Sequence, residues 1–255
     1  MSQSHDRHIQ VENKNALLEL LTAGIPFIKI YIASNSFRDP KTKKIIELAN
    51  HSGIPIERIT RKRIDRISRT SSCESVIGIK PAPKEKSLEE LLQEVRGKKK
   101  DLFLLLLNDI QYLQNIGAIL RTAYGCGVDG VIISKRKSGY LTEEVTRISM
   151  GASERIPVIQ MNVFDALKKL KDDGIRIVGV HMDGKPHFEE TLSGDLVLVL
   201  GSEDRGISPR ILSRCDTTVS IPMEAGIESL NVSAAAAVVM YEKKRQDSQK
   251  IQKLT

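Results

Sequence analysis

Three segments in the second half of the chain carry polar side chains whose types and spacing could perform chemistry. The first contains Asn115, Gly117 and Arg121, the second is the loop 200–206, and the third is the stretch 221–236. The chain's 3 cysteines form no CxxC pair, and its 5 histidines are scattered without metal-ligand spacing. The segments therefore favour hydrogen bonding and charge stabilisation over metal or thiol chemistry.

The first segment lies within a predicted helix, 114–126. Gly117 and Arg121 are four residues apart, so they share one helix face. A glycine there lets another group approach the backbone closely, and an arginine one turn later offers a fixed positive fork. The alternative is that Asn115 only caps the helix and Arg121 only forms a surface ion pair.

The second segment follows an apolar strand, 196–200, at the strand end where open α/β sheets bind ligands. Gly201 and Gly206 leave backbone N–H and C=O groups accessible. The loop matches neither the dinucleotide fingerprint nor the Walker loop, so phosphate cradling is not favoured.

The third segment leads into an alanine-rich helix. Ser229 is expected to cap this helix, which continues past Tyr241. Its first turns, 232–240, are apolar nearly all round, which predicts a buried helix. Glu228 and Asn231 would then lie against the core and need partners in the protein or in a ligand.

Patterning divides the chain into a small α/β domain at 1–80, a linker at 81–100 and a larger domain at 101–255. The linker carries one charged helix, with Ser87 and Glu90 spaced as a capping box. In the larger domain, strands alternate with helices, which predicts a parallel sheet covered on both faces. The first element is expected to begin at about Val11. The expected helices are 15–23, 40–51, 61–68, 87–95, 114–126, 141–150, 163–172, 208–215 and one that follows the Ser229 cap at about 230 and continues past 241. The expected strands are 27–33, 54–59, 75–79, 102–107, 128–134, 156–160, 175–181, 196–200 and 217–221.

The composition points to a polyanionic partner. The 255-residue chain has a formal net charge of +7, which favours nucleic acid, although an ordinary basic cytosolic enzyme is the alternative. A basic run in the first domain fits contact with a phosphate backbone, or else a solvated helix face. Its members are Arg58, Arg61, Lys62, Arg63, Arg66 and Arg69. No apolar run suits a membrane span or a signal peptide, so we expect a cytoplasmic protein without membrane contact.

Taken together and in this order, the three segments resemble the three sequence motifs of the SpoU/TrmH family of RNA 2′-O-ribose methyltransferases. The motif residues are Asn115, Gly117 and Arg121, then Leu200, Gly201, Ser202, Glu203 and Gly206, then Ile221, Pro222, Met223, Glu228, Ser229, Leu230, Asn231, Val232 and Ser233. Residues 150–158 are similar to the family's connecting segment. The likeness covers the second domain, and the first domain resembles the family's ribosomal-protein-like RNA-binding domain.

The resemblance implies a deep trefoil knot in the C-terminal domain, S-adenosylmethionine as cofactor, no metal, and a homodimer. It implies a catalytic group of Asn115, Arg121, Glu203, Ser229 and Asn231. It implies cofactor contacts from Leu200, Gly201, Glu203, Ile221, Met223, Leu230 and Ser233. Within that group, Arg121 would orient the ribose hydroxyl and stabilise its developing charge, because a guanidinium stays protonated. Glu203 would bond Arg121 or backbone N–H groups.

Two places depart from the family pattern. Tyr112-Leu113 replaces an Asp-Pro pair before the first motif, and residues 72–75 replace a His-Gln-Gly type segment. The first departure concerns the shape of the loop before the first motif. The second concerns the RNA contacts of the first domain.

The sequence thus predicts a methyltransferase acting on RNA, with ribosomal RNA favoured over transfer RNA. The same chemistry could serve antibiotic self-resistance. A non-catalytic RNA-binding ribosome-assembly factor is an alternative of another class, although the presence of Arg121, Glu203 and Asn231 argues against it. A nucleotide-dependent enzyme on a doubly wound sheet is disfavoured because the dinucleotide fingerprint is absent.

Overall fold

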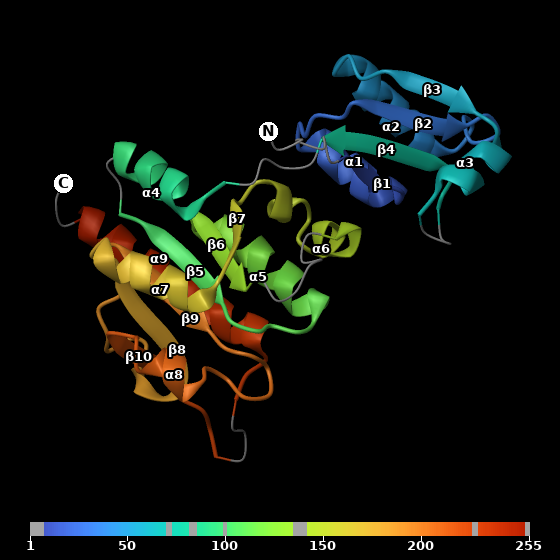
Figure 1. Ribbon diagram of the computed structural model, residues 1–255. Coiled ribbons are helices and arrows are strands. Elements are labelled where there is room, and N and C mark those ends of the chain that lie inside the picture. The colour runs from blue at the N-terminus through green and yellow to red at the C-terminus, as the bar shows by residue number, and fades with distance from the viewer. Residues whose placement is uncertain are drawn as a thin grey trace. The chain divides into compact units, whose positions relative to one another are not determined.

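The computed structural model describes residues 8–69, 73–81, 86–98, 101–134, 142–225 and 229–252 (Figure 1). The chain forms two compact units, residues 1–84 and 85–255. Helix α4, Leu88–Gly97, falls in the stretch expected to be a linker but belongs to the second unit. The reason is its apolar stripe, which is buried in the core of that unit. The capping box between Ser87 and Glu90 at its start is present, as predicted.

The first unit is a small sheet covered by helices. Its strand order is β1-β4-β2-β3, with β2 and β3 parallel and the β1–β4 and β4–β2 pairs antiparallel. Strand β1 was not expected from the sequence, because its partner β4 lies far along the chain and leaves no local signal. The elements are β1 (His8–Val11), α1 (Lys14–Thr22), β2 (Lys29–Ala33), α2 (Pro40–His51), β3 (Ile56–Ile59), α3 (Arg61–Ile67) and β4 (Val76–Pro81).

The second unit contains the predicted parallel sheet. Its strand order is β10-β8-β9-β5-β6-β7, and every neighbouring pair is parallel. The threading of a trefoil knot is not established by this strand order and stays a prediction. After α4 the elements are β5 (Phe103–Leu107), α5 (Leu113–Cys126), β6 (Gly130–Ser134), α6 (Glu143–Ile148), a 3-10 turn (Ala152–Glu154), β7 (Val158–Met161), α7 (Val163–Asp172), β8 (Arg176–Pro186), β9 (Leu196–Leu200), α8 (Pro209–Leu212), β10 (Thr217–Ser220) and α9 (Val232–Gln252).

Strand β5 shows why both faces of this sheet are covered. Its side chains alternate between the two faces, as strand geometry requires. Leu105 and Leu107 enter the core shared with α5 and α9, whereas Leu104 and Leu106 enter the core shared with α4 and α7. All five residues of β5 are buried, which accounts for its continuous apolar run.

Helix α9 is less buried than the sequence suggests. Ala236, Val239 and Met240 are buried, but Ala234 is exposed, so the expectation of burial all round is wrong within this chain. The buried side packs in the core that α9 shares with α5, and the opposite side is left uncovered. No helix in the described ranges is both long enough and apolar enough to cross a membrane.

Gly117 sets the spacing between α5 and α6. A Cβ atom at this position would lie 2.6 Å from both Cβ and Cγ2 of Ile148 on α6. The close approach expected from the glycine is therefore made by a neighbouring helix. It fixes α5, whose first turn carries Asn115.

We expect Gly117→Ala to destabilise the second unit by about 1–3 kcal/mol, because the added methyl group overpacks the contact with Ile148. Gly125→Ala in the same helix is the matched control. Its Cβ would meet only the Tyr241 hydroxyl oxygen at 3.6 Å, and alanine favours helix. Urea unfolding of both variants would measure the difference, and equal midpoints would refute the packing role of Gly117.

Candidate functional site

The candidate site forms where the order of the parallel strands reverses. Strands β5 and β9 are neighbours, although the chain runs from β5 through β6 and β7 before it returns to β9. Ligands of open α/β sheets bind outside the carboxyl ends of strands at such a point. Glu203 follows β9 here, and Asn115 follows β5.

The Glu203 carboxylate holds the start of α5. It accepts hydrogen bonds from the backbone N–H of Gln111, at 3.1 Å to Oε2, and of Tyr112, at 3.3 Å to Oε1. Its third donor is the Asn115 side-chain Nδ2, at 2.8 Å to Oε1. A negative charge beside a helix N-terminus is favourable, and Tyr112 supplies no side-chain cap of its own. The backbone contacts expected for Glu203 are therefore present, while its contact with Arg121 is not.

Two asparagines extend this contact into the third motif. The side-chain N–H of Asn115 donates a hydrogen bond to Glu203, so the Asn115 carbonyl oxygen faces the other way. This oxygen accepts a hydrogen bond from Nδ2 of Asn231 at 3.0 Å. The Asn231 carbonyl oxygen then accepts the backbone N–H of Ser233 at 2.9 Å and the Ser233 hydroxyl at 2.7 Å. We call Glu203, Asn115 and Asn231 the amide relay. It joins all three motifs by side-chain hydrogen bonds, which are donated from Asn231 to Asn115 and from Asn115 to Glu203.

Asn231, not Ser229, caps helix α9. The helix begins at Val232, and the Asn231 side chain accepts from Ser233 in the usual N-cap pattern. The expected cap at Ser229 is wrong because the chain becomes helical two residues later than its sequence suggests. Glu228 lies outside the described residues.

Opposing influences set the charge of Glu203. Partial burial is the largest single influence and raises the pKa of its carboxyl group. The hydrogen bonds from Asn115 and from the backbone N–H groups of Gln111 and Tyr112 together outweigh burial, so the pKa of Glu203 lies below its usual value. Glu203 is an anion at neutral pH and serves as the acceptor on which the relay is built.

The loop after β9 is closed by its own backbone. Ser202 and Gly206 exchange both backbone hydrogen bonds, at 3.1 and 2.9 Å. A Cβ atom on Gly201 would lie 2.0 Å from the carbonyl carbon of Gly206, and Gly206 itself has a φ of +61°. The two glycines are needed for this tight turn.

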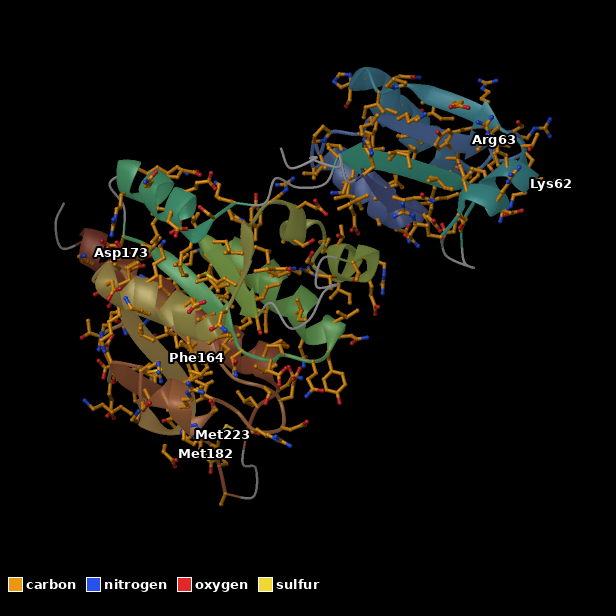
Figure 2. The ribbon with its side chains drawn as sticks, in the orientation of Figure 1. Lys62, Arg63, Phe164, Asp173, Met182 and Met223 are labelled. Carbon is orange, nitrogen blue, oxygen red and sulfur yellow. The ribbon has the colours of Figure 1, made fainter. Side chains whose placement is uncertain are left out.

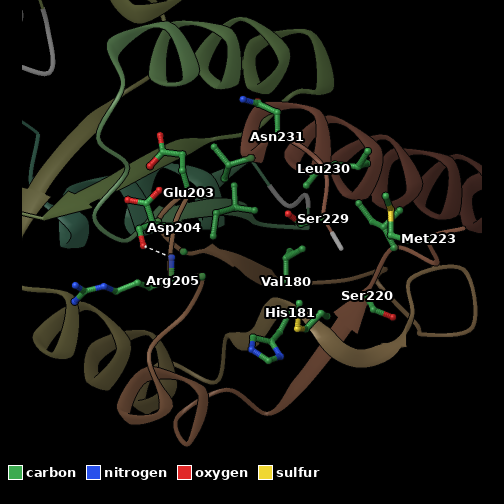
Figure 3. Close-up of a pocket in the computed structure, with 18 residues that line it drawn as sticks. Val180, His181, Glu203, Asp204, Arg205, Ser220, Met223, Ser229, Leu230 and Asn231 are labelled. Atoms are coloured by element: carbon green, nitrogen blue, oxygen red, sulfur yellow. Dashed lines mark hydrogen bonds between the residues drawn. The ribbon is translucent and has the colours of Figure 1, made fainter. Parts of the chain in front are cut away.

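A cavity of about 480 Å³ adjoins the loop (Figure 3). Figure 3 shows Glu203 at one end of the cavity and Met223 at the other. Predicted site residues that line it are Leu200, Gly201, Glu203, Ile221, Met223, Ser229, Leu230 and Asn231. Ser233 and Asn115 are not among the described lining residues; their side chains are hydrogen-bonded to residues that are, Ser233 to Asn231 and Asn115 to Glu203 and Asn231.

The sequence did not identify a further wall of this cavity, formed by Val180, His181 and Met182. These residues lie in an outward loop of β8. Gly179 pairs with Thr218 and Lys185 pairs with Val219, so the residues between Gly179 and Lys185 leave the ladder with β10. A strand that leaves its ladder has no signature in hydrophobic periodicity, and Gly184, whose Cβ would meet the β10 backbone at 2.5 Å, was the one available hint.

Arg121 lies outside the cavity. It is exposed, is not among the described residues that line the cavity, and has no carboxylate partner in the described part of the chain. Six residues of α-helix separate it from Asn115, which is about 240° of rotation and about 9 Å of rise. The same chain therefore presents the relay and Arg121 on different sides of α5.

The basic residues of the first unit are exposed around β3 and α3, where Figure 2 labels Lys62 and Arg63. Arg61 is held by Asp65 at 2.9 Å, Arg63 pairs with Glu57 at 3.5 Å, and Arg58 stacks on a phenylalanine ring. Lys62, Arg66 and Arg69 have side chains without a carboxylate partner among the described residues. These three are the most available of the six for phosphate.

The cavity suits a largely apolar ligand with a few polar groups. Its volume lies within the range of small-molecule sites, and aliphatic side chains, methionine and loop backbone form most of its wall. The described residues contain no group of three or more His, Cys, Asp or Glu that could hold a metal ion. Binding and orientation are what these residues can provide.

Glu203→Gln is expected to lower the free energy of unfolding at pH 7 by roughly 1–3 kcal/mol, because the charge that strengthens three hydrogen bonds is removed. A carboxyl group with a depressed folded pKa stabilises above its unfolded pKa and loses this effect as the pH falls through the folded value. The difference between wild type and variant should thus shrink at acid pH, below 4.5. Urea unfolding across pH, with exposed Glu189→Gln as control, would measure it; a pH-independent difference would contradict the assignment.

Comparisons with known proteins identify the family of the chain. The SpoU rRNA methylase family profile matches residues 102–241, and the profile for RNA 2′-O ribose methyltransferase substrate binding matches residues 11–79. A Bacillus subtilis protein named as a TrmH family tRNA/rRNA methyltransferase is 34% identical, covering 95% of this chain and 96% of its own.

Solved structures show the same fold. A Porphyromonas gingivalis protein described as a TrmH family RNA methyltransferase aligns with a TM-score of 0.72 at 25% identity, over 94% of this chain and 90% of its own. The SpoU methyltransferase AviRb of Streptomyces viridochromogenes, in complex with AdoMet, aligns with a TM-score of 0.74 at 21% identity, over 96% and 91%. The chain belongs to the SpoU/TrmH family of RNA methyltransferases.

Proposed function

We propose that this protein transfers a methyl group from S-adenosylmethionine to a ribose 2′-hydroxyl of RNA, with ribosomal RNA as the favoured substrate. The observation that carries the proposal is the amide relay, which brings residues of all three family motifs together beside the cavity. Its acceptor and donor groups have partners within the chain, so the polar end of the cavity is already organised before a ligand binds.

The cavity residues fit this cofactor. The loop that Gly201 and Gly206 close lines the cavity, and Leu200, Ile221 and Leu230 offer apolar surface for an adenosyl group. The cofactor supplies an electrophilic methyl group when bound. The chain's own residues must bind it, exclude water and place the ribose oxygen in line.

Arg121 is the residue that we assign to the ribose hydroxyl. Its guanidinium stays protonated, so it orients the hydroxyl and stabilises the developing negative charge and does not remove the proton as a base. Glu203 does not fill that role either, because its oxygens accept three donors from the α5 region. Ser229 and Asn231 would hold the loop and the polar groups of the substrate.

A homodimer reconciles Arg121 with the cavity. Arg121 is exposed on a different side of α5 from the relay, and the uncovered side of α9 lies on the neighbouring helix. We propose that these surfaces meet a second copy, whose Arg121 reaches the cavity of the first. Isologous contacts of this kind are the commonest in homo-oligomers.

The first unit would bind the RNA. Lys62, Arg66 and Arg69 offer cations without a carboxylate partner among the described residues, and the matching profile is that of a substrate-binding domain. Contacts to phosphate release counterions, so affinity for RNA should fall steeply with salt.

We expect the protein, incubated with radiolabelled S-adenosylmethionine and ribosomal RNA lacking its modifications, to label that RNA at an alkali-resistant ribose. Arg121→Ala should reduce transfer by about 10²–10³, because one charge-stabilising group is lost, while cofactor affinity stays unchanged. Arg121→Lys should restore little, since an ammonium lacks the planar fork.

The control for these variants is Arg96→Ala, which removes an exposed arginine of α4 that is paired with Asp173. Label in transfer RNA would keep the chemistry and change the substrate. No label in either RNA, despite cofactor binding, would favour the ribosome-assembly reading.

Mixing two inactive variants tests the shared site. A heterodimer of Arg121→Ala and Asn231→Ala would have one cavity with an intact Asn231 and the other protomer's intact Arg121. Re-equilibrated mixtures should recover about a quarter of wild-type activity by the statistics of a two-fold dimer. If both groups act within one chain, the mixture stays as inactive as its components.

A further inference from the structure

Three arginines in the segment between β9 and β10 have no acid partner among the described residues. Arg205 lines the cavity in the loop after β9, and Arg210 and Arg214 follow on and just after α8. In the described part of the chain none of the three side chains has a carboxylate within ion-pair distance. We call Arg205, Arg210 and Arg214 the arginine ridge.

Most other cations of this unit contrast with the ridge, because they are neutralised locally. Among described residues, Arg121, Arg147 and Lys244 share the lack of an acid partner. Lys244 lies 5.8 Å from the centre of the Tyr241 ring, but its ammonium group donates to the Gly125 carbonyl oxygen, and no second cation shares that ring. The paired cations include Arg96 with Asp173, Lys98 with Glu94, Lys168 with Asp172, Lys171 with Asp216, Arg176 with Glu190, Lys243 with Asp247, Arg245 with Glu242 and Lys250 with Asp101.

One aromatic ring fixes two members of the ridge. The guanidinium carbons of Arg210 and Arg214 lie 4.5 and 4.8 Å from the centre of the Phe164 ring on α7, which Figure 2 labels. Arg214 also donates to the backbone carbonyl oxygen of Arg210 at 2.7 Å. A stacked guanidinium loses side-chain freedom but keeps N–H edges free for an anion.

This arrangement places like charges close together. Two cations on one ring lie within about one Debye length of each other at 0.1 M salt, so their repulsion is not screened away. The acids nearest in sequence do not neutralise the ridge: Glu203 accepts its donors from the α5 region, and Asp204 forms no ion pair with Arg205 among the described residues. Asp216 accepts the Ile177 backbone N–H and faces Lys171. An external polyanion would relieve the repulsion.

We infer that the arginine ridge binds the sugar-phosphate backbone of the RNA substrate, next to the nucleotide that enters the cavity. The inference rests on the proposed function and adds a second RNA contact, on the catalytic unit itself. Figure 3 shows Arg205 extending away from the cavity, so it does not fill the ligand space. Three exposed or half-exposed forks spread over ten residues suit successive phosphates better than one small anion.

The test is the salt dependence of RNA binding by the full chain carrying Arg210→Gln and Arg214→Gln. The control is Arg96→Gln with Lys168→Gln, which removes the same charge from cations that are already paired. With an unmodified ribosomal RNA transcript, the ridge variant should lose about 1.5 from the slope of log affinity against log salt. Its affinity at 0.1 M salt should fall about tenfold, whereas the control should follow wild type.

S-adenosylmethionine affinity and the circular dichroism melt of each variant would show that the fold is retained. An unchanged slope in a folded ridge variant overturns the inference and leaves the proposed function intact. A reduced slope in a protein that methylates no RNA would support RNA binding by the ridge and refute the proposed methyltransferase function. A change in sedimentation without RNA would assign the ridge to contact between copies, and so overturn the inference.

Discussion

The carboxylate of Glu203 is the group on which the candidate site depends. It lies partly out of water and must find donors, and it finds them in the loop after β5 and in the first turn of α5. Its charge decides which way the amide of Asn115 points, and Asn115 then decides the orientation of Asn231. One anion thus sets the polarity of a hydrogen-bonded chain that ends at the first turn of α9.

Two glycines allow the hydrogen bonds of the amide relay to form. Gly201 lets the loop after β9 turn back on itself, and Gly117 lets α6 press against α5, so both elements that carry relay residues are held by backbone contact. The parallel sheet supplies the remaining constraint, because its reversal of strand order brings the ends of β5 and β9 together. The cavity wall accordingly combines aliphatic and methionine side chains with polar groups, and the relay carboxylate of Glu203 lies at one end.

Sequence patterns predicted the sheet and most elements, because buried parallel strands such as β5 and β9 read as unbroken apolar runs. These predictions were wrong where packing between distant parts of the chain decides the structure. The stretch 81–100 has the composition of a linker, yet the apolar stripe of α4 completes a core. Ser229 and Asn231 are both good caps, and only the observed backbone selects Asn231.

The cavity itself was partly predictable. The motif loops supplied Leu200, Gly201, Ile221 and Met223, but the wall from β8 depends on residues leaving a ladder, which periodicity does not record. Likewise, helical spacing puts Arg121 and Gly117 on one face and Asn115 on another. It could not show that Asn115 bonds both Glu203 and Asn231, because these partners come from distant parts of the chain.

The position of β5 in the sheet also has a kinetic consequence. Its partner β9 lies about ninety residues later in the chain, and Asp195 beside β9 accepts the backbone N–H of Leu102. A ribosome adds roughly 5–20 residues per second, so an all-apolar strand waits several seconds with one edge unpaired. Non-local parallel pairing of this kind is slow, and it exposes the nascent chain to aggregation. In the first unit the corresponding wait is somewhat shorter, since β1 pairs with β4 about seventy residues later.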